Sequence, residues 1–168
     1  MKALTVWQPW ASLIIEGAKP YEFRGWRAPR SMIGQRIVIH AGARPMQYGE
    51  VEMLIIKLRR GGLVSAETCL RKELALEMLM PLTSKLNWAR RDELFPRSVG
   101  RGTAIIGEPR NGYDVAEEFG LPHVNDSDRD EHANWGWPML EIEKWPEPVP
   151  MKGAQGFWNW PTPAEAML

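Results

Sequence analysis

Short apolar runs bounded by glycine or proline recur along this chain, and they limit it to a fold built on short strands. Alternation or β-branched content predicts strands at residues 3–7, 21–24, 36–41, 102–107, 135–143 and 157–160. Pro138 is expected to place the first half of its strand at a sheet edge or bulge, because proline cannot donate to a strand ladder.

Helical patterns gather in two places between these strands. One helix is predicted to begin at Pro9 and end at Gly17. Two more are expected over residues 50–60, before Gly61, and from a Ser65 cap to about Met80, before Pro81. Because about 35 residues cannot support their own core, these two helices are interpreted as an insertion at about 45–95. The chain is therefore expected to form one α+β domain over residues 1–168, built on a small barrel or strongly bent sheet.

Composition excludes several classes of protein. Cys69 is the only cysteine, which rules out an internal disulfide or a thiolate cluster and fits a reducing compartment. No segment approaches the roughly 20 uninterrupted apolar residues that span a bilayer. We therefore expect a cytoplasmic protein, most simply a monomer, with no membrane partner and no cofactor.

A metal site is not expected either. His40, His123 and His132 are far apart in sequence, and none forms a close pair one helical turn apart with a neighbouring carboxylate. The acidic run at residues 126–131 opens like a calcium loop, but it lacks the glycine at the sixth position and has Trp137 where the bidentate Glu belongs. A solvated acidic loop is the preferred interpretation.

Charge is unevenly distributed although the net charge is zero. Residues 1–101 carry 17 Lys and Arg against 9 Asp and Glu, a balance of +8, so the remaining 67 residues carry −8. This asymmetry predicts a basic face, unless the fold interleaves the two halves and cancels the field.

Nine tryptophans are present, and several lie beside polar groups, as in Trp7-Gln8-Pro9-Trp10 and Arg24-Gly25-Trp26. Exposed indoles stack on nucleobases, whereas the alternative is that each is a core residue with a partner for its N–H. Pro20 forces Lys19 into extended geometry, and Glu22 and Arg24 then share one face of a strand. If that face lines a cleft, the two charges should pair; otherwise they form a weak exposed pair. The start of the helix near Pro9, together with Lys19, is a candidate anion site.

These residues resemble the ASCH family. The resemblance covers nearly the whole chain and is carried by the segments 5–11, Gly17-x-Lys19-x-x-Glu22-x-Arg24, 39–41, 100–107, Trp137 with Glu141, and 148–158. It implies a PUA-like fold, a small β-barrel with flanking helices, and a cleft between barrel and helix. It also implies a role in binding RNA or nucleoside-like ligands.

Some relatives of this family hydrolyse their ligands, and the resemblance extends to them only in part. One branch deacylates acetylated cytidine with a Lys, a Thr three residues later and a distant Glu. Lys19 matches the Lys, but Glu22 occupies the Thr position, so the hydroxyl nucleophile is missing. Other members are linked to RNA cleavage, for which Lys19, Tyr21 and His40 would be the candidates. His40 in a strand is more often a structural histidine.

Three functions follow as hypotheses. The first is binding of RNA, single-stranded nucleic acid or a small nucleoside-like ligand in a tryptophan-lined cleft that carries Lys19, Glu22 and Arg24. Its candidate ligand-binding residues are Trp7, Gln8, Pro9, Trp10, Lys19, Glu22, Arg24, Trp26 and His40. The second is a hydrolase of acylated nucleosides or RNA, with Lys19 and Glu22 as catalytic residues. The third is a protein-interaction module of a transcription or translation complex.

Overall fold

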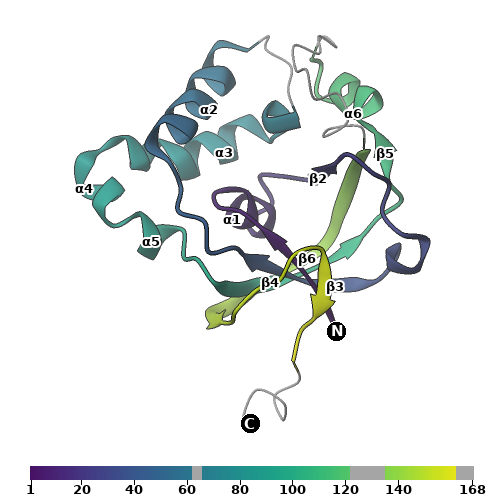
Figure 1. The fold of residues 1–168 in the computed structure, drawn as a ribbon. Coiled ribbons are helices and arrows are strands. Elements are labelled where there is room, and N and C mark those ends of the chain that lie inside the picture. The colour runs from purple at the N-terminus through teal and green to yellow at the C-terminus, as the bar shows by residue number, and fades with distance from the viewer. Residues whose placement is uncertain (62–65, 122–134, 162–168) are drawn as a thin grey trace.

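A single sheet organises the chain in the computed structural model, which describes residues 1–61, 66–121 and 135–161. The strand order is β2-β6-β4-β3-β1-β7, with β5 also paired to β6 (Figure 1). Their bounds are β1 Lys2–Val6, β2 Tyr21–Arg24, β3 Arg36–Ala41, β4 Val99–Ile106, β5 Arg110–Asn111, β6 Trp135–Pro150 and β7 Phe157–Asn159. Among the strands in these ranges, only β1 and β3 pair in parallel; the other pairs are antiparallel.

The long strand β6 gives the sheet its curl. It pairs with β2 at its start and with β4 along most of its length, and its register with β4 shifts on both sides of Thr103. Glu141 in the middle of β6 has a φ of 43°, which bends the strand there. The sheet is therefore a half-barrel, and the expected α+β class with a strongly bent sheet is confirmed.

Helix α1 (Trp10–Ile15) fills the curl of the sheet, as Figure 1 shows. It contacts β1, β3, β4 and β6. Ile14 and Ile15 join the main core with strand residues such as Ile37, Ile39 and Ile106. Because these side chains are at most 4% exposed, the position of α1 relative to the sheet is fixed by packing.

A helical segment lies between β3 and β4 on one side of the half-barrel. Its helices are α2 (Tyr48–Arg60), α3 (Lys72–Leu79), α4 (Lys85–Ala89) and α5 (Arg91–Leu94), with short 3₁₀ turns at Ala66–Thr68 and Met80–Thr83. A second apolar core joins Leu13 and Ala18 of the α1 region to Leu54, Ile55 and Leu58 of α2. The segment therefore packs on the half-barrel through a shared core.

The prediction for this segment was wrong in detail. Four α-helices are described where two were expected, and the helix expected from Ser65 begins at Lys72; Ser65 itself lies outside the described residues. Cys69 and Leu70 are buried instead, and the Arg71 N–H donates to the Ala18 carbonyl at 2.8 Å. The predicted end of this helix before Pro81 is confirmed, because α3 ends at Leu79 and Pro81 lies in the first turn of the following 3₁₀ helix.

Two predictions near β6 also need correction. Strand β6 runs to Pro150, well past the expected end, and Pro138 lies on a strand with neighbours on both sides rather than at an edge. Pro138 is tolerated because it falls between the pairing of Gly136 with β5 and that of Met139 with β4. After β5 the chain enters α6 (Gly112–Glu118), which is capped by the Asn111 side chain.

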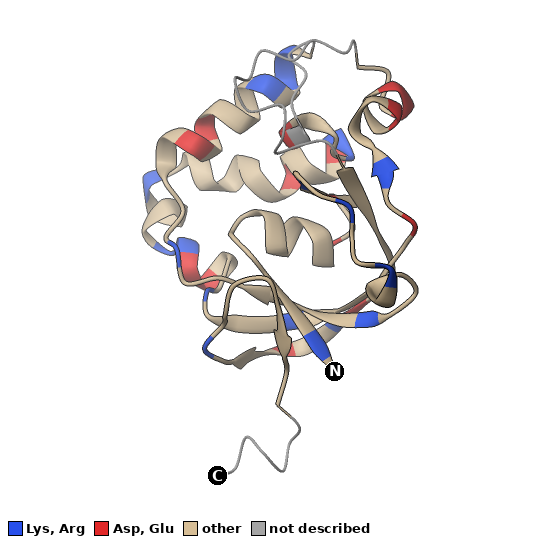
Figure 2. Cartoon of the chain, turned by 45° about the vertical axis from the view of Figure 1, so that its right-hand side comes forward, with Lys and Arg blue, Asp and Glu red and all other residues tan. Residues whose placement is uncertain are grey.

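The charged halves of the sequence are interleaved by the fold. Arg27 pairs with Glu108, and Arg36 pairs with Glu141 and Glu143 at 3.1 and 3.3 Å. Figure 2 shows blue and red segments mixed over the ribbon. The described residues therefore support interleaving of the two halves rather than a single basic face. None of the helices in the described part of the chain is long and apolar enough to span a membrane.

Candidate functional site

Three charged side chains from the α1–β2 turn and β2 meet in the interior, and we refer to Lys19, Glu22 and Arg24 as the charged triad. Lys19 Nζ lies 2.8 Å from Glu22 Oε2, and Arg24 Nη2 lies 2.9 Å from Glu22 Oε1. The side chains of Lys19 and Glu22 are only 6% and 9% exposed, whereas that of Arg24 is 24% exposed. The expected pairing of Glu22 with Arg24 is thus present, in the buried setting rather than the exposed one.

Local backbone geometry places the triad. Gly17 ends α1 with a φ of 78°, and the Lys19 N–H donates to the Leu13 carbonyl at 2.9 Å, which turns the chain back along the helix. Lys19 Nζ also donates to the carbonyl of Tyr21 at 2.5 Å. Strand β2 then alternates, so Glu22 and Arg24 project to one side and Tyr21 packs on the other with Val115 and Cys69.

Aromatic rings surround the two cations of the triad. Lys19 Nζ lies 5.5 Å from the ring centroid of Phe23 and 6.0 Å from that of Trp10. The Arg24 guanidinium lies 6.0 Å from the ring of Trp137, a core residue opposite Glu22 in the β2–β6 ladder. Such cation–π contacts contribute to holding both side chains in place in a poorly hydrated site.

A cavity of about 440 Å³ opens between the β1–α1 segment and α2. One wall consists of Trp7, Pro9 and Trp10. The other wall comes from the helical segment and its approach, with Arg44, Gly49, Glu50, Val51, Met53, Leu54, Lys57 and Glu67. This volume suits a nucleoside-sized ligand. The triad residues are not part of this lining. Trp10 lines the cavity and also lies beside the triad, with its ring centroid 6.0 Å from Lys19 Nζ.

A comparison with models of protein families identifies the family of this chain. The ASCH domain model matches residues 4–92, which is just over half of the chain and includes the triad and both walls of the cavity. The chain belongs to the ASCH domain family. The expected family and its PUA-like fold are thereby confirmed, and ASCH domains are generally associated with RNA binding. A comparison with curated proteins found no match.

The tryptophans predicted for the ASCH cleft lie in different surroundings. Trp7 is 54% exposed, and the Arg44 guanidinium covers its ring at 4.5 Å from the centroid. Trp26 is 59% exposed but lies outside the cavity lining, and its backbone carbonyl accepts a hydrogen bond from Trp137. The structure therefore brings Trp7, Pro9 and Trp10 together at the cavity and leaves Trp26 apart from them.

Gln8 points into the protein rather than into the cavity. It is 2% exposed, and its amide nitrogen donates to Ser12 Oγ and to the Pro96 carbonyl, both at 2.8 Å. Its amide oxygen accepts from the Ser12 N–H, while the N–H groups of Ala11 and Leu13 bond to the carbonyls of Trp7 and Pro9. These N–H groups at the start of α1 are therefore occupied, which removes much of the proposed anion site there.

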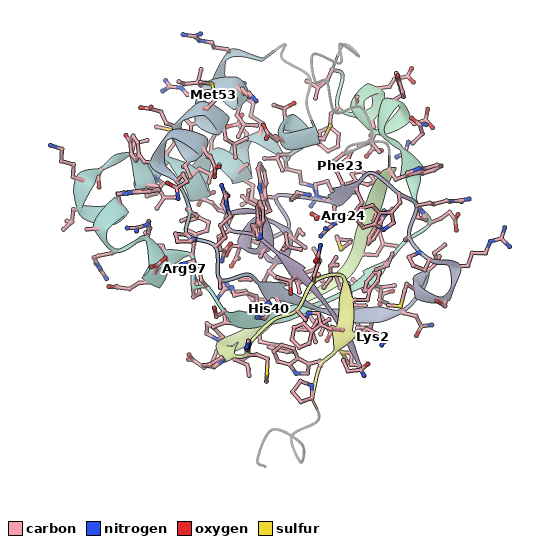
Figure 3. The ribbon with its side chains drawn as sticks, viewed as in Figure 1. Lys2, Phe23, Arg24, His40, Met53 and Arg97 are labelled. Carbon is pink, nitrogen blue, oxygen red and sulfur yellow. The ribbon has the colours of Figure 1, made fainter. Side chains whose placement is uncertain are left out.

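His40 lies away from both the triad and the cavity, as Figure 3 shows relative to Arg24 and Met53. It is 1% exposed, its Nδ1 is 3.2 Å from Thr5 Oγ1, and its Nε2 is 2.9 Å from the Met151 carbonyl. The carbonyl requires a donor, so Nε2 carries a proton. These contacts support a structural role for His40 rather than a catalytic one.

The α2 wall of the cavity was not predicted from the sequence. Arg44, Glu50 and Lys57 were not among the candidate residues, although each lines the cavity. For Glu50 and Lys57 the sequence shows only that they lie near opposite ends of a predicted helix. The helix dipole favours charges at these positions whether or not a ligand binds. The acidic run at 126–131 and His123 and His132 lie outside the described residues. Within the part of the chain that the structure describes, no His, Cys, Asp and Glu side chains gather as a metal site.

The triad makes a direct prediction about stability. Replacing Glu22 with Gln leaves the buried Lys19 and the partly buried Arg24 without their shared carboxylate, so we expect the free energy of unfolding to fall by about 3 kcal/mol. Urea denaturation measures the change. Glu108→Gln removes an exposed carboxylate that also pairs with an arginine, Arg27, and should cost less than about 1 kcal/mol. Equal losses in the two variants would show that the triad is not a buried, interdependent group.

His40 makes a second prediction, about pH. Burial lowers the pKa of His40 below its ordinary 6.5, so the unfolded chain takes up a proton before the folded protein does. The stability that His40 contributes is complete above pH 6.5 and is lost as pH falls toward the folded pKa, by at most about 1.4 kcal/mol per pH unit. In urea denaturation, the stability difference between the wild type and His40→Gln should therefore shrink below pH 6.5. A difference that stays constant from pH 8 to 5 would contradict it.

Proposed function

We propose that the chain binds RNA or a nucleobase or nucleoside-like ligand at the surface formed by Trp7, Trp10 and the charged triad. The observation that carries this proposal is the incomplete neutralisation of the triad. Two cations share one carboxylate, so one positive charge is in excess in a largely buried place. Buried charge of this kind is costly unless a partner completes it, and a phosphate or a polar base edge is such a partner.

Arg24 is the member of the triad with capacity for a ligand. Its Nη2 bonds to Glu22 and, at 3.5 Å, to the Thr5 carbonyl, and among the described residues its buried Nε has no acceptor. Lys19 is almost fully buried and already donates to Glu22 and Tyr21. Arg24 is therefore assigned the ligand contact, and Lys19 the role of holding Glu22 in place. Arginine also presents a planar set of donors, which suits phosphate and base edges.

Tryptophan supplies the other half of the proposed interaction. Trp7 is exposed on the β1–α1 segment, and Trp10 lies against both Lys19 and the cavity. Exposed indoles beside cationic groups are the usual combination in proteins that bind single-stranded nucleic acid, because rings stack on bases and cations meet the backbone. This combination favours a base-containing ligand over a purely anionic one.

Hydrolysis has less support than binding. In a hydrolase, Glu22 would act as a base toward water, yet both of its oxygens bond to cations of the protein. Lys19 is likewise engaged with Glu22 and the Tyr21 carbonyl. The triad thus resembles a preformed binding group more than an acid–base pair.

Replacing Trp7 with Ala tests how much stacking on the indole contributes to ligand binding. Stacking on an indole contributes about 1–3 kcal/mol per base, so affinity for an RNA oligomer or nucleoside should fall roughly 5- to 150-fold. Titration calorimetry or tryptophan fluorescence measures this. Trp88→Ala is the matched control, because Trp88 also carries an arginine, Arg91, over its ring but lies outside the cavity lining. The proposal fails if the wild type binds no nucleoside, RNA or single-stranded DNA, or if both variants bind equally well.

A further inference from the structure

The cavity beside Trp7 and Trp10 has balanced charges in its wall, whereas the triad has two cations and one carboxylate. Arg44 makes two hydrogen bonds to Glu50, at 2.5 and 3.0 Å, and Lys57 pairs with Glu67 at 2.9 Å. Its lining therefore holds two cations and two carboxylates, each cation paired within the wall. A phosphate entering the cavity would meet as much negative as positive charge, so the cavity offers an anion no net attraction.

The rest of the lining is aromatic or aliphatic. Trp7, Pro9 and Trp10 face Val51, Met53 and Leu54 of α2 across the space. The ring of Trp7 is more than half exposed, and its one described polar companion is the flat guanidinium of Arg44. The indole of Trp7 and the guanidinium of Arg44 beside it are planar groups on which a flat heterocycle can stack, with the apolar side chains of α2 shielding it from water.

We propose that this cavity takes one uncharged nucleobase, stacked on the indole wall and bounded on its other side by α2. Arg44 donates to the base edge and Glu50 accepts from it, so a ring that carries both donors and acceptors satisfies both. The inference rests on the proposed base-binding function and adds two points: α2 builds half of the pocket, and the phosphate stays outside it. The base comes either from a free nucleoside or from one nucleotide of an RNA strand.

Gly49 allows a sharp test because it lines the cavity and a β-carbon added there meets no atom within 4 Å. Gly49→Leu therefore begins a side chain at the cavity without a clash at its β-carbon, and leucine favours the helix more than glycine does. Gln47→Leu is the matched control: Gln47 is exposed just before α2, makes no capping bond with its side chain and does not line the cavity. Thermal denaturation should show both variants folded, with the melting temperature of Gly49→Leu at or above that of the wild type.

Titration calorimetry with the four ribonucleosides, their 5′-monophosphates and a short RNA oligomer gives the readout. We expect Gly49→Leu to weaken base binding at least tenfold and Gln47→Leu to leave it unchanged. Nucleoside affinity should be nearly independent of salt, because no counterions are released when an uncharged base enters. If only the oligomer binds, and Gly49→Leu weakens it, the base comes from a strand and the inference holds.

Failure of this inference can be separated from failure of the proposed function. If the wild type and Gly49→Leu bind nucleosides or RNA equally, the cavity is not the base site, while base binding itself stands. If the wild type binds neither, both are wrong. An independent readout is the methyl resonance of Met53 in the cavity wall, in protein labelled with ¹³C at the methionine methyls. It should shift on nucleoside binding, and an unshifted Met53 signal at saturation would overturn the inference.

Discussion

The carboxylate of Glu22 is the group on which the arrangement of this site depends. It lies between Lys19, on the turn that follows α1, and Arg24, at the end of β2, and it bonds to both. Arg24 in turn reaches the carbonyl of Thr5 on β1, close to the segment that carries Trp7 and Trp10. One buried carboxylate therefore connects helix, turn and two strands around the place where aromatic and cationic groups meet. Without it, two charges would repel each other in a poorly hydrated interior.

Local patterns were enough to predict the frame of this site. The bounds of β2 and β3 follow from periodicity, proline and glycine, and the structure has them where the sequence placed them. Helix α1 begins at Trp10, one residue after the predicted start, with Pro9 as its N-cap. Because side chains alternate along a strand, the sequence also indicated that Glu22 and Arg24 share a face. The sequence left open whether they form a buried pair or a weak exposed one, and only the structure shows that the pair is buried.

Contacts between distant segments could not be predicted in the same way. Helix α3 begins at Lys72 because Arg71 bonds to Ala18, a contact across more than 50 residues that no local propensity encodes. Gln8 has the sequence context of a ligand contact, yet Ser12 and Pro96 occupy its amide. The α2 wall of the cavity was missed for the same reason, since its position opposite Trp7 depends on the core shared by Leu13 and Leu54.

Photo-crosslinking to RNA that contains 4-thiouridine is the measurement that tests the central claim most directly, because it reports which residues touch a base without any substitution in the protein. If the indole wall and the triad form the binding surface, mapping the crosslinked residues should place them within residues 7–24 or at the α2 wall, residues 44–57. Crosslinks confined to other surfaces, such as α4 and α5, with the segment from Trp7 to Arg24 unlabelled, would contradict the account.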